Sequence, residues 1–450
     1  MARTPVTVVL RYRKANTYGH HALLAALESA DPQDRHEVRL ARDGAQLVAA
    51  IDEAVDAGRQ VLVAWSFYSP DFPAATAQLG EVRQATTRAG ERVLHVVGGV
   101  HATAEPLVTA RAGFDAVAVG EGETTFVRLV EALAAGQDWR VVPGLAHLDA
   151  AGQLDRAAPA VAQDLDRYRS FPFRQRLASP IELTRGCIYA CRFCQTPFMF
   201  RARFRHRSVV GVREHVAELR RRGLRDVRFI TPTALSYGSQ DESVNLDAVE
   251  QLLAGVREEL IPGGRIFLGS FPSEVRPEHV TPQALRLLRR YVANDNLIIG
   301  AQSGSEEMLR RSHRGHGVAV VEEAVRVALA EGFTPNVDVI FGMPGETEDE
   351  AMATVALVER LAWLGARIHG HSFMPLPGTP WRDEQPAQLG RAPLAALQRL
   401  TSEGAIYGTW ERQREVAAEL ADGRSPAAGH RIRPVRSRDT AHRQAERRRG

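Results

Sequence analysis

Cysteine is nearly absent from this sequence, which contains only Cys187, Cys191 and Cys194 among 450 residues. Three cysteines allow at most one disulfide, so a disulfide framework is excluded. Long apolar runs are also missing, and none approaches the length that spans a bilayer. The first residues carry no charged segment followed by an apolar segment and a cleavage site, so no secretory signal is indicated. We therefore expect a cytoplasmic protein with no membrane partner.

Lysine is rarer still, because Lys14 is the single lysine and nearly all the positive charge is arginine. The net charge of +3 is too small to indicate a nucleic-acid partner by itself. Residues 422–450 are rich in arginine, glycine, proline and alanine without an apolar period, which predicts a disordered tail. No aromatic side chain is interleaved in this tail for base stacking, so we do not expect nucleic-acid binding.

The three cysteines lie in one short stretch with the spacing C-x3-C-x2-C, from Cys187 to Cys194. Thiolates are soft and nucleophilic ligands, and this spacing lets a short loop turn its sulfurs toward one point. Three sulfurs can hold three irons of a four-iron cluster and leave the fourth iron open for chemistry. Two alternatives stay open from the residues alone: a zinc site completed by His206, and one disulfide with a spare thiol.

Residues 1–138 alternate short apolar runs with amphipathic stretches, which predicts a doubly wound parallel sheet in a Rossmann-like domain. The expected strands are 6–10, 37–40, 61–65, 93–97 and 116–119. The expected helices are 23–29, 45–57, 74–89, 103–111 and 123–134. In such sheets ligands bind beyond the carboxyl ends of the strands. The small, polar and glycine-rich residues that fall at these ends are Ser66, Gly98, Gly99, His101, Gly120, Glu121, Gly122 and Glu123.

Residues 139–177 contain turn residues at 142–145 and 149–152, which indicate a linker with a short hairpin.

Residues 178–383 then show six strand–helix repeats, which predict a partial (β/α)6 barrel with its chemistry at the strands' carboxyl ends. The expected strands are 181–184, 226–230, 265–269, 296–300, 336–341 and 368–373. The expected helices between them are 208–222, 246–259, 283–291, 306–311, 318–331 and 348–364. Residues 384–421 read as C-terminal helices, at 392–407 and 411–420.

The cysteine spacing, followed by this ordered series of strand ends, resembles the radical S-adenosylmethionine (SAM) family. In that family the open iron of a [4Fe–4S] cluster chelates SAM, and reductive cleavage gives methionine and a 5′-deoxyadenosyl radical. The resemblance implies that the three cysteines bind the cluster and that the strand ends bind SAM. The positions carried over to SAM binding are Phe193, Thr231, Thr233, Ser270, Gln302, Ser303, Arg314, Met343 and Met374.

Several of these positions differ from the family's pattern or have a structural alternative. The Thr231-Pro232-Thr233 segment is not rich in glycine, so its role would rest on backbone carbonyls. Gln302 stands where many relatives have glutamate, and it keeps hydrogen bonding without the charge. Arg314 is suited to grip the SAM carboxylate in a bidentate pair, or it makes a surface ion pair. Ser270 could instead cap a helix, and the methionines could fill the core.

The two glycine motifs of the first domain resemble the cobalamin-binding domain found ahead of many radical SAM domains. Many cobalamin proteins carry Asp-x-His-x-x-Gly after the first strand, and that motif is absent here. His20 and His21 are nearby, but we expect them to begin a helix, with His21 facing solvent. The resemblance therefore implies bound cobalamin with its lower nucleotide displaced and no protein histidine on cobalt.

Together these resemblances imply a cobalamin-dependent radical SAM enzyme, most simply a methyltransferase acting at a poorly activated carbon of a small molecule. Its cofactors would be a [4Fe–4S] cluster, SAM and cobalamin, and its electron donor a protein such as flavodoxin or ferredoxin. One alternative keeps these cofactors but catalyses a rearrangement, cyclisation or ring contraction. A second alternative is a non-catalytic cobalamin or iron–sulfur sensor.

Overall fold

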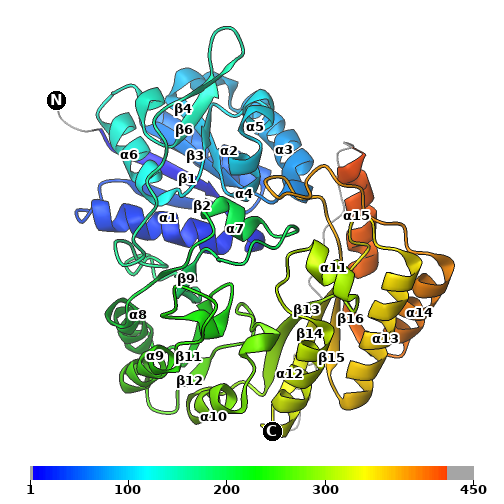
Figure 1. Ribbon diagram of the computed structural model, residues 1–450. Coiled ribbons are helices and arrows are strands. Elements are labelled where there is room, and N and C mark those ends of the chain that lie inside the picture. The colour runs from blue at the N-terminus through cyan, green and yellow to red at the C-terminus, as the bar shows by residue number, and fades with distance from the viewer. Residues whose placement is uncertain (1–3, 423–450) are drawn as a thin grey trace, which may run out of the picture.

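The computed structural model describes residues 4–422, which form an N-terminal α/β domain and a larger α/β domain below it in Figure 1. The arginine-rich segment 423–450 lies outside the described residues, so the disorder expected there is not tested. Within residues 4–422, no helix combines the length and apolar character needed to cross a membrane.

The N-terminal sheet has seven strands in the order β2-β1-β3-β4-β5-β6-β7. Strands β1 to β5 pair in parallel, whereas β6 and β7 add antiparallel at one edge. The hairpin predicted in the linker is therefore present, and it extends this sheet past residue 138. The bounds are β1 (Val6–Arg11), β2 (Glu37–Ala41), β3 (Gln60–Ser66), β4 (Val93–Gly98), β5 (Ala116–Ala118), β6 (Leu145–Leu148) and β7 (Leu154–Arg156).

Helices cover both faces of this sheet, because its central strands are apolar on both sides. In β1, Val8 and Leu10 pack on one face with helices α1 and α6, whereas Val9 packs on the other with α2 and α3. This alternation confirms the doubly wound, Rossmann-like prediction. The helix bounds are α1 (Thr17–Ala30), α2 (Gly44–Asp56), α3 (Phe72–Ala85), α4 (Val100–Ala104), α5 (Pro106–Arg111) and α6 (Glu123–Ala134).

The single helix predicted over 103–111 is wrong, because the structure has two short helices, α4 and α5, that meet at Glu105. Glu105 has φ −125° and ψ 57°, outside the helical region. The residue before a proline is sterically disfavoured in the α conformation, and Pro106 follows directly.

The second domain is an open, partial barrel built from two parallel sheets, in the orders β12-β11-β8 and β13-β14-β15-β16. The segment that follows β12 runs beside β13, where Val275 forms an isolated bridge with Ile299 and Ile298 donates to the carbonyl of Gly269 at 2.8 Å. The six strands predicted for the partial barrel are present in order. The bounds are β8 (Ile181–Glu182), β11 (Asp226–Ile230), β12 (Arg265–Phe267), β13 (Asn296–Gln302), β14 (Thr334–Phe341) and β15 (Arg367–Ser372), and a small antiparallel pair is formed by β9 (Thr184–Arg185) and β10 (Arg205–His206).

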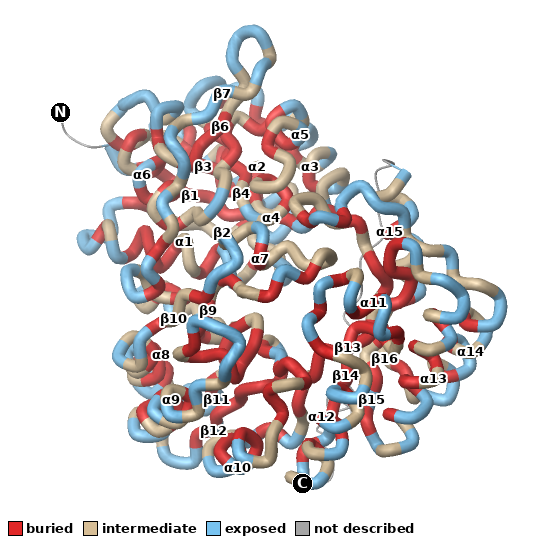
Figure 2. Tube along the Cα trace, viewed as in Figure 1, coloured by how far each residue is buried: buried red, intermediate tan, exposed pale blue. Residues whose placement is uncertain are grey.

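Helices lie outside the barrel, and two apolar clusters fill the space between them and the strands. The burial pattern in Figure 2 follows this arrangement, with buried segments along the strands and exposed segments on the outer helix faces. The bounds of these helices are α8 (Val209–Arg221), α9 (Leu246–Glu259), α10 (Pro282–Tyr291), α11 (Glu306–Arg311), α12 (Val318–Ala330) and α13 (Glu348–Leu364). Helix α7 (Gln195–Met199) instead follows the cysteine loop and contacts α4 of the first domain (Figure 1).

The C-terminal segment contains a strand that the sequence pattern did not indicate. Helix α14 (Arg391–Ser402) ends before Gly404, and β16 (Ile406–Gly408) then pairs in parallel with β15. The prediction that residues 392–407 form one helix is therefore wrong at its end. Gly404 has φ 79°, the left-handed conformation in which glycine commonly ends a helix. Helix α15 (Trp410–Ala421) follows, as predicted.

Candidate functional site

The cysteine loop begins at Gly186, directly after β9. Gly186 has φ 85°, and a Cβ atom there would lie 2.1 Å from the carbonyl oxygen of Arg203. A larger residue would therefore displace the backbone of the facing segment. The glycine thus lets the chain turn sharply into Cys187.

The three cysteines are free thiols in one apolar cluster with Tyr189 and Phe204. Cys191 is buried, and Cys187 and Cys194 are half-buried. Burial raises the pKa of Cys187 to about 11 and also raises the pKa of Cys194. Metal binding requires thiolates, so a positive ion or cluster in this loop would have to displace the protons. The single-disulfide alternative is not what the structure shows.

His206 does not offer a nitrogen to a zinc ion. Its Nε2 lies 2.7 Å from the carbonyl oxygen of Ser239, and its Nδ1 lies 2.9 Å from the hydroxyl of Thr184. Because a carbonyl only accepts, Nε2 donates there and Nδ1 accepts from Thr184, which leaves no free lone pair. Among the described residues, the cysteine sulfurs also do not form a group converging within 4.8 Å.

Arg314 lies against the cysteine loop and is buried. Its Nη1 is 3.7 Å from the Cys191 sulfur, its Nη2 donates to the carbonyl of Gly300 at 2.7 Å, and its Nε donates to His316 at 3.0 Å. The surface ion pair considered for Arg314 is therefore not present. The guanidinium instead holds a fixed position beside a cysteine sulfur, at the carboxyl end of β13.

Ser270 follows the third barrel strand, and its hydroxyl is buried without a hydrogen-bond partner. A buried hydroxyl without a partner costs free energy, so this atom is available to a ligand. Ser270 does not cap a helix in this structure, since its hydroxyl makes no such bond.

The other predicted SAM-binding side chains are mostly engaged within the protein. Thr231 donates to the carbonyl of Thr233 at 3.0 Å, and the Ser303 hydroxyl lies 3.2 Å from that of Thr354. Gln302 is buried at the end of β13 with φ 75°. Met343 packs in an apolar cluster that Phe193 also contacts, and Met374 is half-buried in the loop after β15. Ligand contacts for these residues stay predictions.

A cavity of about 300 Å³ lies at the carboxyl ends of β3, β4 and β5, where the first domain faces the barrel. Its walls include residues on both sides of the cysteine loop, Arg185 and Phe200. The predicted residues of the first domain that line it are Ser66, Gly98, Gly99, Gly120, Glu121, Gly122 and Glu123. The glycine motifs therefore meet at one site, as the parallel-sheet rule predicts.

Gly99 shows how tightly this wall is built. It has φ 94°, and a Cβ atom there would lie 2.8 Å from the Ser66 hydroxyl oxygen. His101, in contrast, does not line the cavity. Its ring stacks on Phe72 and its Nδ1 lies 3.0 Å from the Ser69 hydroxyl.

His20 lines the cavity, whereas His21 packs inward. Burial, with the nearby His21 and Arg11, lowers the pKa of His20 to about 3, and neither ring nitrogen of His20 has a hydrogen-bond partner. The expectation that His21 faces solvent is wrong. His21 is buried, and its Nε2 lies 2.8 Å from the Tyr12 hydroxyl, which fixes the ring against the loop after β1.

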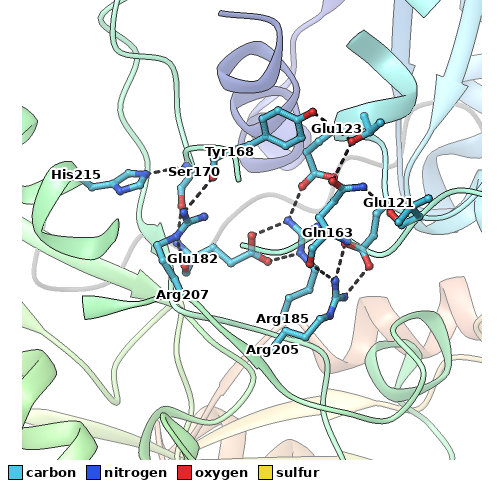
Figure 3. Close-up of polar contacts among 12 residues, drawn as sticks. Glu121, Glu123, Gln163, Tyr168, Ser170, Glu182, Arg185, Arg205, Arg207 and His215 are labelled. Carbon is cyan, nitrogen blue, oxygen red and sulfur yellow. Dashed lines mark hydrogen bonds and ion pairs between the residues drawn. The ribbon is translucent and has the colours of Figure 1, made fainter. Parts of the chain in front are cut away.

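An ion-pair network joins the two domains beside this cavity (Figure 3). Arg185 donates to Glu182 at 2.8 and 2.7 Å, to Glu121 at 2.7 Å and to Glu123 at 2.6 Å. Arg205 also contacts Glu121, and this contact is bidentate, with distances of 3.0 and 2.6 Å. Glu121 and Glu123, the carboxylates of the second glycine motif, are thus paired with arginines of β9 and β10, the strands that flank the cysteine loop. We name Glu121, Glu123, Glu182, Arg185 and Arg205 the interdomain network.

The charges of the network support one another. Burial alone would raise the pKa of Glu121, but its hydrogen bond to Arg205 and the charge of Arg185 lower it. Burial likewise opposes ionisation of Glu182, and the charge of Arg185 lowers its pKa. These glutamates therefore stay ionised in an environment with little water.

Sequence reasoning did not single out Arg185, Arg205 or Glu274. For Arg185 and Arg205 the available signal was a charged side chain in a short strand beside the cysteine loop, whereas Glu274 lies outside the named strands and left no such signal. Desolvation by the surrounding protein and the charge of Asp338 raise the pKa of Glu274 to about 7, although solvent still reaches its side chain. Glu274 also interacts electrostatically with Cys194 and Arg314, which places its charge on the cysteine side of the barrel.

Comparison with known families decides the identity of the second domain. Residues 181–358 match the model of the radical SAM superfamily. The chain carries a radical SAM domain. This match includes the cysteine loop and the strand ends as far as β14, so it confirms the sequence-based recognition.

Proteins similar to this chain include a methyltransferase and a methylthiotransferase. The uncharacterized methyltransferase PH0819 of Pyrococcus horikoshii is 25% identical over 313 residues, which are 65% of this chain and 65% of the relative. The threonylcarbamoyladenosine tRNA methylthiotransferase MtaB of Thermotoga maritima is 27% identical over 212 residues, 46% of each chain. The chain thus spans less than two thirds of the length of both relatives.

Solved structures extend the likeness of fold to the N-terminal domain. The radical SAM methyltransferase TsrM of Kitasatospora setae, solved with cobalamin and a [4Fe–4S] cluster, has a TM-score of 0.65 and 20% identity over 85% of this chain and 74% of TsrM. The cobalamin-dependent radical enzyme OxsB, solved with aqua-cobalamin and SAM, has a TM-score of 0.61 and 15% identity over 90% of this chain and 56% of OxsB. The fold prediction is thereby confirmed for both domains.

Proposed function

We propose that the protein is a cobalamin-dependent radical SAM enzyme that methylates a poorly activated carbon of a small molecule. The observation that carries the proposal is the cavity at the glycine motifs, which reaches the residues flanking the cysteine loop. A group bound against Gly99 and Gly120 would therefore lie beside a group bound by the cysteines. TsrM supports this assignment, since it has the same fold, is named a methyltransferase and was solved with both cofactors.

The residues present fit these groups. Three free cysteines supply the thiolates of a cluster with one open iron. Gly98 and Gly99 line the cavity without side chains, and a Cβ atom at Gly99 would lie 2.8 Å from the hydroxyl oxygen of Ser66, which also lines it. Ser270 and His20 present buried polar atoms without partners, as expected where a ligand completes the contacts.

When bound, the cluster supplies the electron that cleaves SAM, and cobalamin carries the methyl group to the substrate. Cys187, Cys191 and Cys194 hold the cluster, and Arg314 places a positive charge where a carboxylate of SAM can pair with it. Leu23, Phe126 and Leu129 give the deep wall of the cavity an apolar surface that excludes water. We further propose a small-molecule substrate and an external electron donor such as flavodoxin or ferredoxin.

The decisive test is the cobalamin content of protein reconstituted without oxygen and then desalted. We expect about one cobalamin per chain and, with SAM labelled in its methyl group, label in the product. Retained cobalamin without transferred label would favour the rearrangement alternative. No retained cobalamin, in protein that still binds iron and cleaves SAM, would remove cobalamin from the proposal.

An Ala118→Leu substitution is expected to reduce cobalamin retention at least about tenfold, because the added carbons enter the cavity at the end of β5. Cobalt and iron are counted in the same sample. Iron should stay near the wild-type content, because Ala118 is distant in sequence and domain from the cysteines. Equal loss of iron and cobalt would show general misfolding, and unchanged cobalt would contradict the location of the site.

A Ser270→Ala protein is expected to bind SAM about 3- to 10-fold more weakly, the effect of one lost hydrogen bond. Its stability should not fall, because the hydroxyl has no partner within the protein. Ser372→Ala is the matched control, since Ser372 is buried, its hydroxyl donates to the carbonyl of Trp410 at 2.7 Å, and it is not among the positions predicted to bind SAM. Equilibrium dialysis with SAM and urea unfolding measure both variants. Equal SAM affinity in Ser270→Ala and wild type would contradict a role for Ser270.

A further inference from the structure

Two neighbouring barrel strands carry polar side chains on the face that points away from the outer helices. In β14, Val337 and Val339 pack into the apolar cluster under the helices, and Asp338 between them faces the opposite way. In β15, Ile368 packs into the same cluster, so His369 and His371 alternate with the core-facing positions. The two strands are adjacent and parallel (Figure 1). Three potential metal ligands thus project from one sheet face.

The ligand atoms of these three residues converge on one point. His369 Nδ1 lies 3.1 Å from Asp338 Oδ1, and His371 Nε2 lies 3.1 Å from His369 Nδ1. His371 Nε2 lies 3.9 Å from Asp338 Oδ1, which closes the triangle. Among the described residues, this is the group of histidine, cysteine and acidic side chains whose ligand atoms all fall within 4.8 Å.

Hydrogen bonding alone serves this triangle poorly. The Gln413 amide nitrogen faces His371 Nδ1, so a neutral His371 carries its one ring proton on Nε2 and donates it to His369 Nδ1. His369 Nδ1 and the Asp338 carboxylate then face each other at 3.1 Å as two acceptors with no proton between them. A divalent ion in the place of the Nε2 proton would meet three lone pairs at once. The three contacts would then become metal–ligand bonds of the same residues.

We propose that Asp338, His369 and His371 bind a divalent transition-metal ion, at a site separate from the cysteine cluster. Two histidines and one carboxylate on one side of an ion form the facial set that iron(II), zinc and related ions accept, with positions left open. The open positions face solvent, because the side chains of His369 and His371 are 33% and 29% exposed while that of Asp338 is 11% exposed. An oxygen or nitrogen of a substrate could occupy such a position.

One surrounding side chain restricts the ligands to this geometry, and another has to move. The ring of Tyr407, on β16, stacks on His369 with 4.7 Å between ring centroids and 7° between planes. Gln413 of α15 is held by the backbone of Ser372, which donates to its amide oxygen at 2.9 Å, and its amide nitrogen lies 3.4 Å from His371 Nδ1. When His371 Nε2 binds an ion, Nδ1 carries the ring proton, so the Gln413 amide has to turn away from it. Ligands held in place before the ion arrives lose less entropy when it binds. The C-terminal strand thus supports the site.

Zinc binding tests the proposal without substrate or cobalamin. Protein with its reconstituted cluster is dialysed to equilibrium against Zn²⁺, and zinc and iron are counted per chain. The occupied cysteines cannot then take the zinc, and an unchanged iron count verifies this. We expect wild type to bind one zinc more than Asp338→Asn or His371→Ala, whose affinity at this site should fall at least about tenfold.

His147→Gln is the matched control, because the Nε2 of His147 lies 3.9 Å from Asp155 but, among residues 4–422, is not part of a group of three converging ligands. Its zinc content should equal that of wild type. Iron content near wild type in the Asp338 and His371 variants would show that their barrels are folded. Zinc binding that is equal in wild type and both variants, or no zinc binding by wild type with an intact cluster, would overturn the metal site.

Discussion

Replacing Cys191 with alanine is expected to abolish the iron–sulfur cluster and, with it, the cleavage of SAM. Cys191 is the buried member of the three cysteines and the one whose sulfur lies 3.7 Å from Arg314. With two thiolates left, the loop cannot hold three irons of a four-iron cluster. Loss of a ligand should exceed the 10- to 100-fold effect of altering an outer contact, so we expect 5′-deoxyadenosine formation to fall by at least about 100-fold.

Ile188→Ala provides the control for the Cys191 variant. Ile188 lies in the same loop, between Cys187 and Cys191, and its side chain has no ligand atom. Iron, sulfide and 5′-deoxyadenosine are measured on anaerobically reconstituted protein with a strong reductant. The Ile188 variant should retain about four irons and its SAM cleavage. Normal iron content and cleavage in the Cys191 variant would show that the cluster is held elsewhere.

Much of the fold was predictable because its strands are buried on both faces. Runs such as 61–65 are apolar throughout, and a run of that length between helical patterns indicates a central parallel strand. Strand β16 escaped prediction because Ile406 and Tyr407 continue the apolar pattern of the helix before them. Gly404 was the one local signal that the helix ends, and the pairing with β15 is a long-range contact.

The residues of the candidate site also fall into those that local sequence predicts and those that only long-range contacts bring together. The cysteines and glycine motifs were predictable, because spacing within a loop and position after a strand are local properties. The interdomain network was not, since Glu121 and Arg185 are 64 residues apart in the chain and meet only when the domains pack. The polar face of β14 and β15 did leave a signal, an alternation of polar and apolar residues. That alternation tells which sheet face a side chain points to, but it does not tell that Asp338 and the two histidines meet at one point.

An Arg185→Met protein is expected to lose about 3–5 kcal/mol of unfolding free energy, the cost of removing one partner from a buried ion pair. The Arg185 side chain is 11% exposed and contacts three carboxylates, of which Glu121 and Glu123 belong to the other domain. Methionine fills similar space but leaves these carboxylates with less positive charge. Urea unfolding measures the loss. An effect near zero would show that the network contributes little to the joining of the domains.

Arg310→Met is the matched control for this variant. Arg310 makes the same bidentate pair with a glutamate three residues earlier, Glu307, at 2.7 and 2.5 Å. That pair is exposed, and exposed ion pairs contribute little to stability. We therefore expect no measurable change in unfolding. A loss as large as that of Arg185→Met would assign the effect to removal of arginine in general rather than to the buried network.

The pH dependence of the Arg185 variant separates lost charge from lost packing. In wild type the pKa values of Glu121 and Glu182 are lowered, so their stabilising effect is present above the ordinary glutamate pKa and is lost as the pH falls through the lowered values. Without Arg185, the burial that opposes ionisation should raise the pKa of Glu182 above its ordinary value. Protonation then favours the folded variant, and the deficit against wild type should shrink as the pH falls from 7 to about 5. A deficit that stays constant over this range would mean that the cost comes from packing and not from unpaired carboxylates.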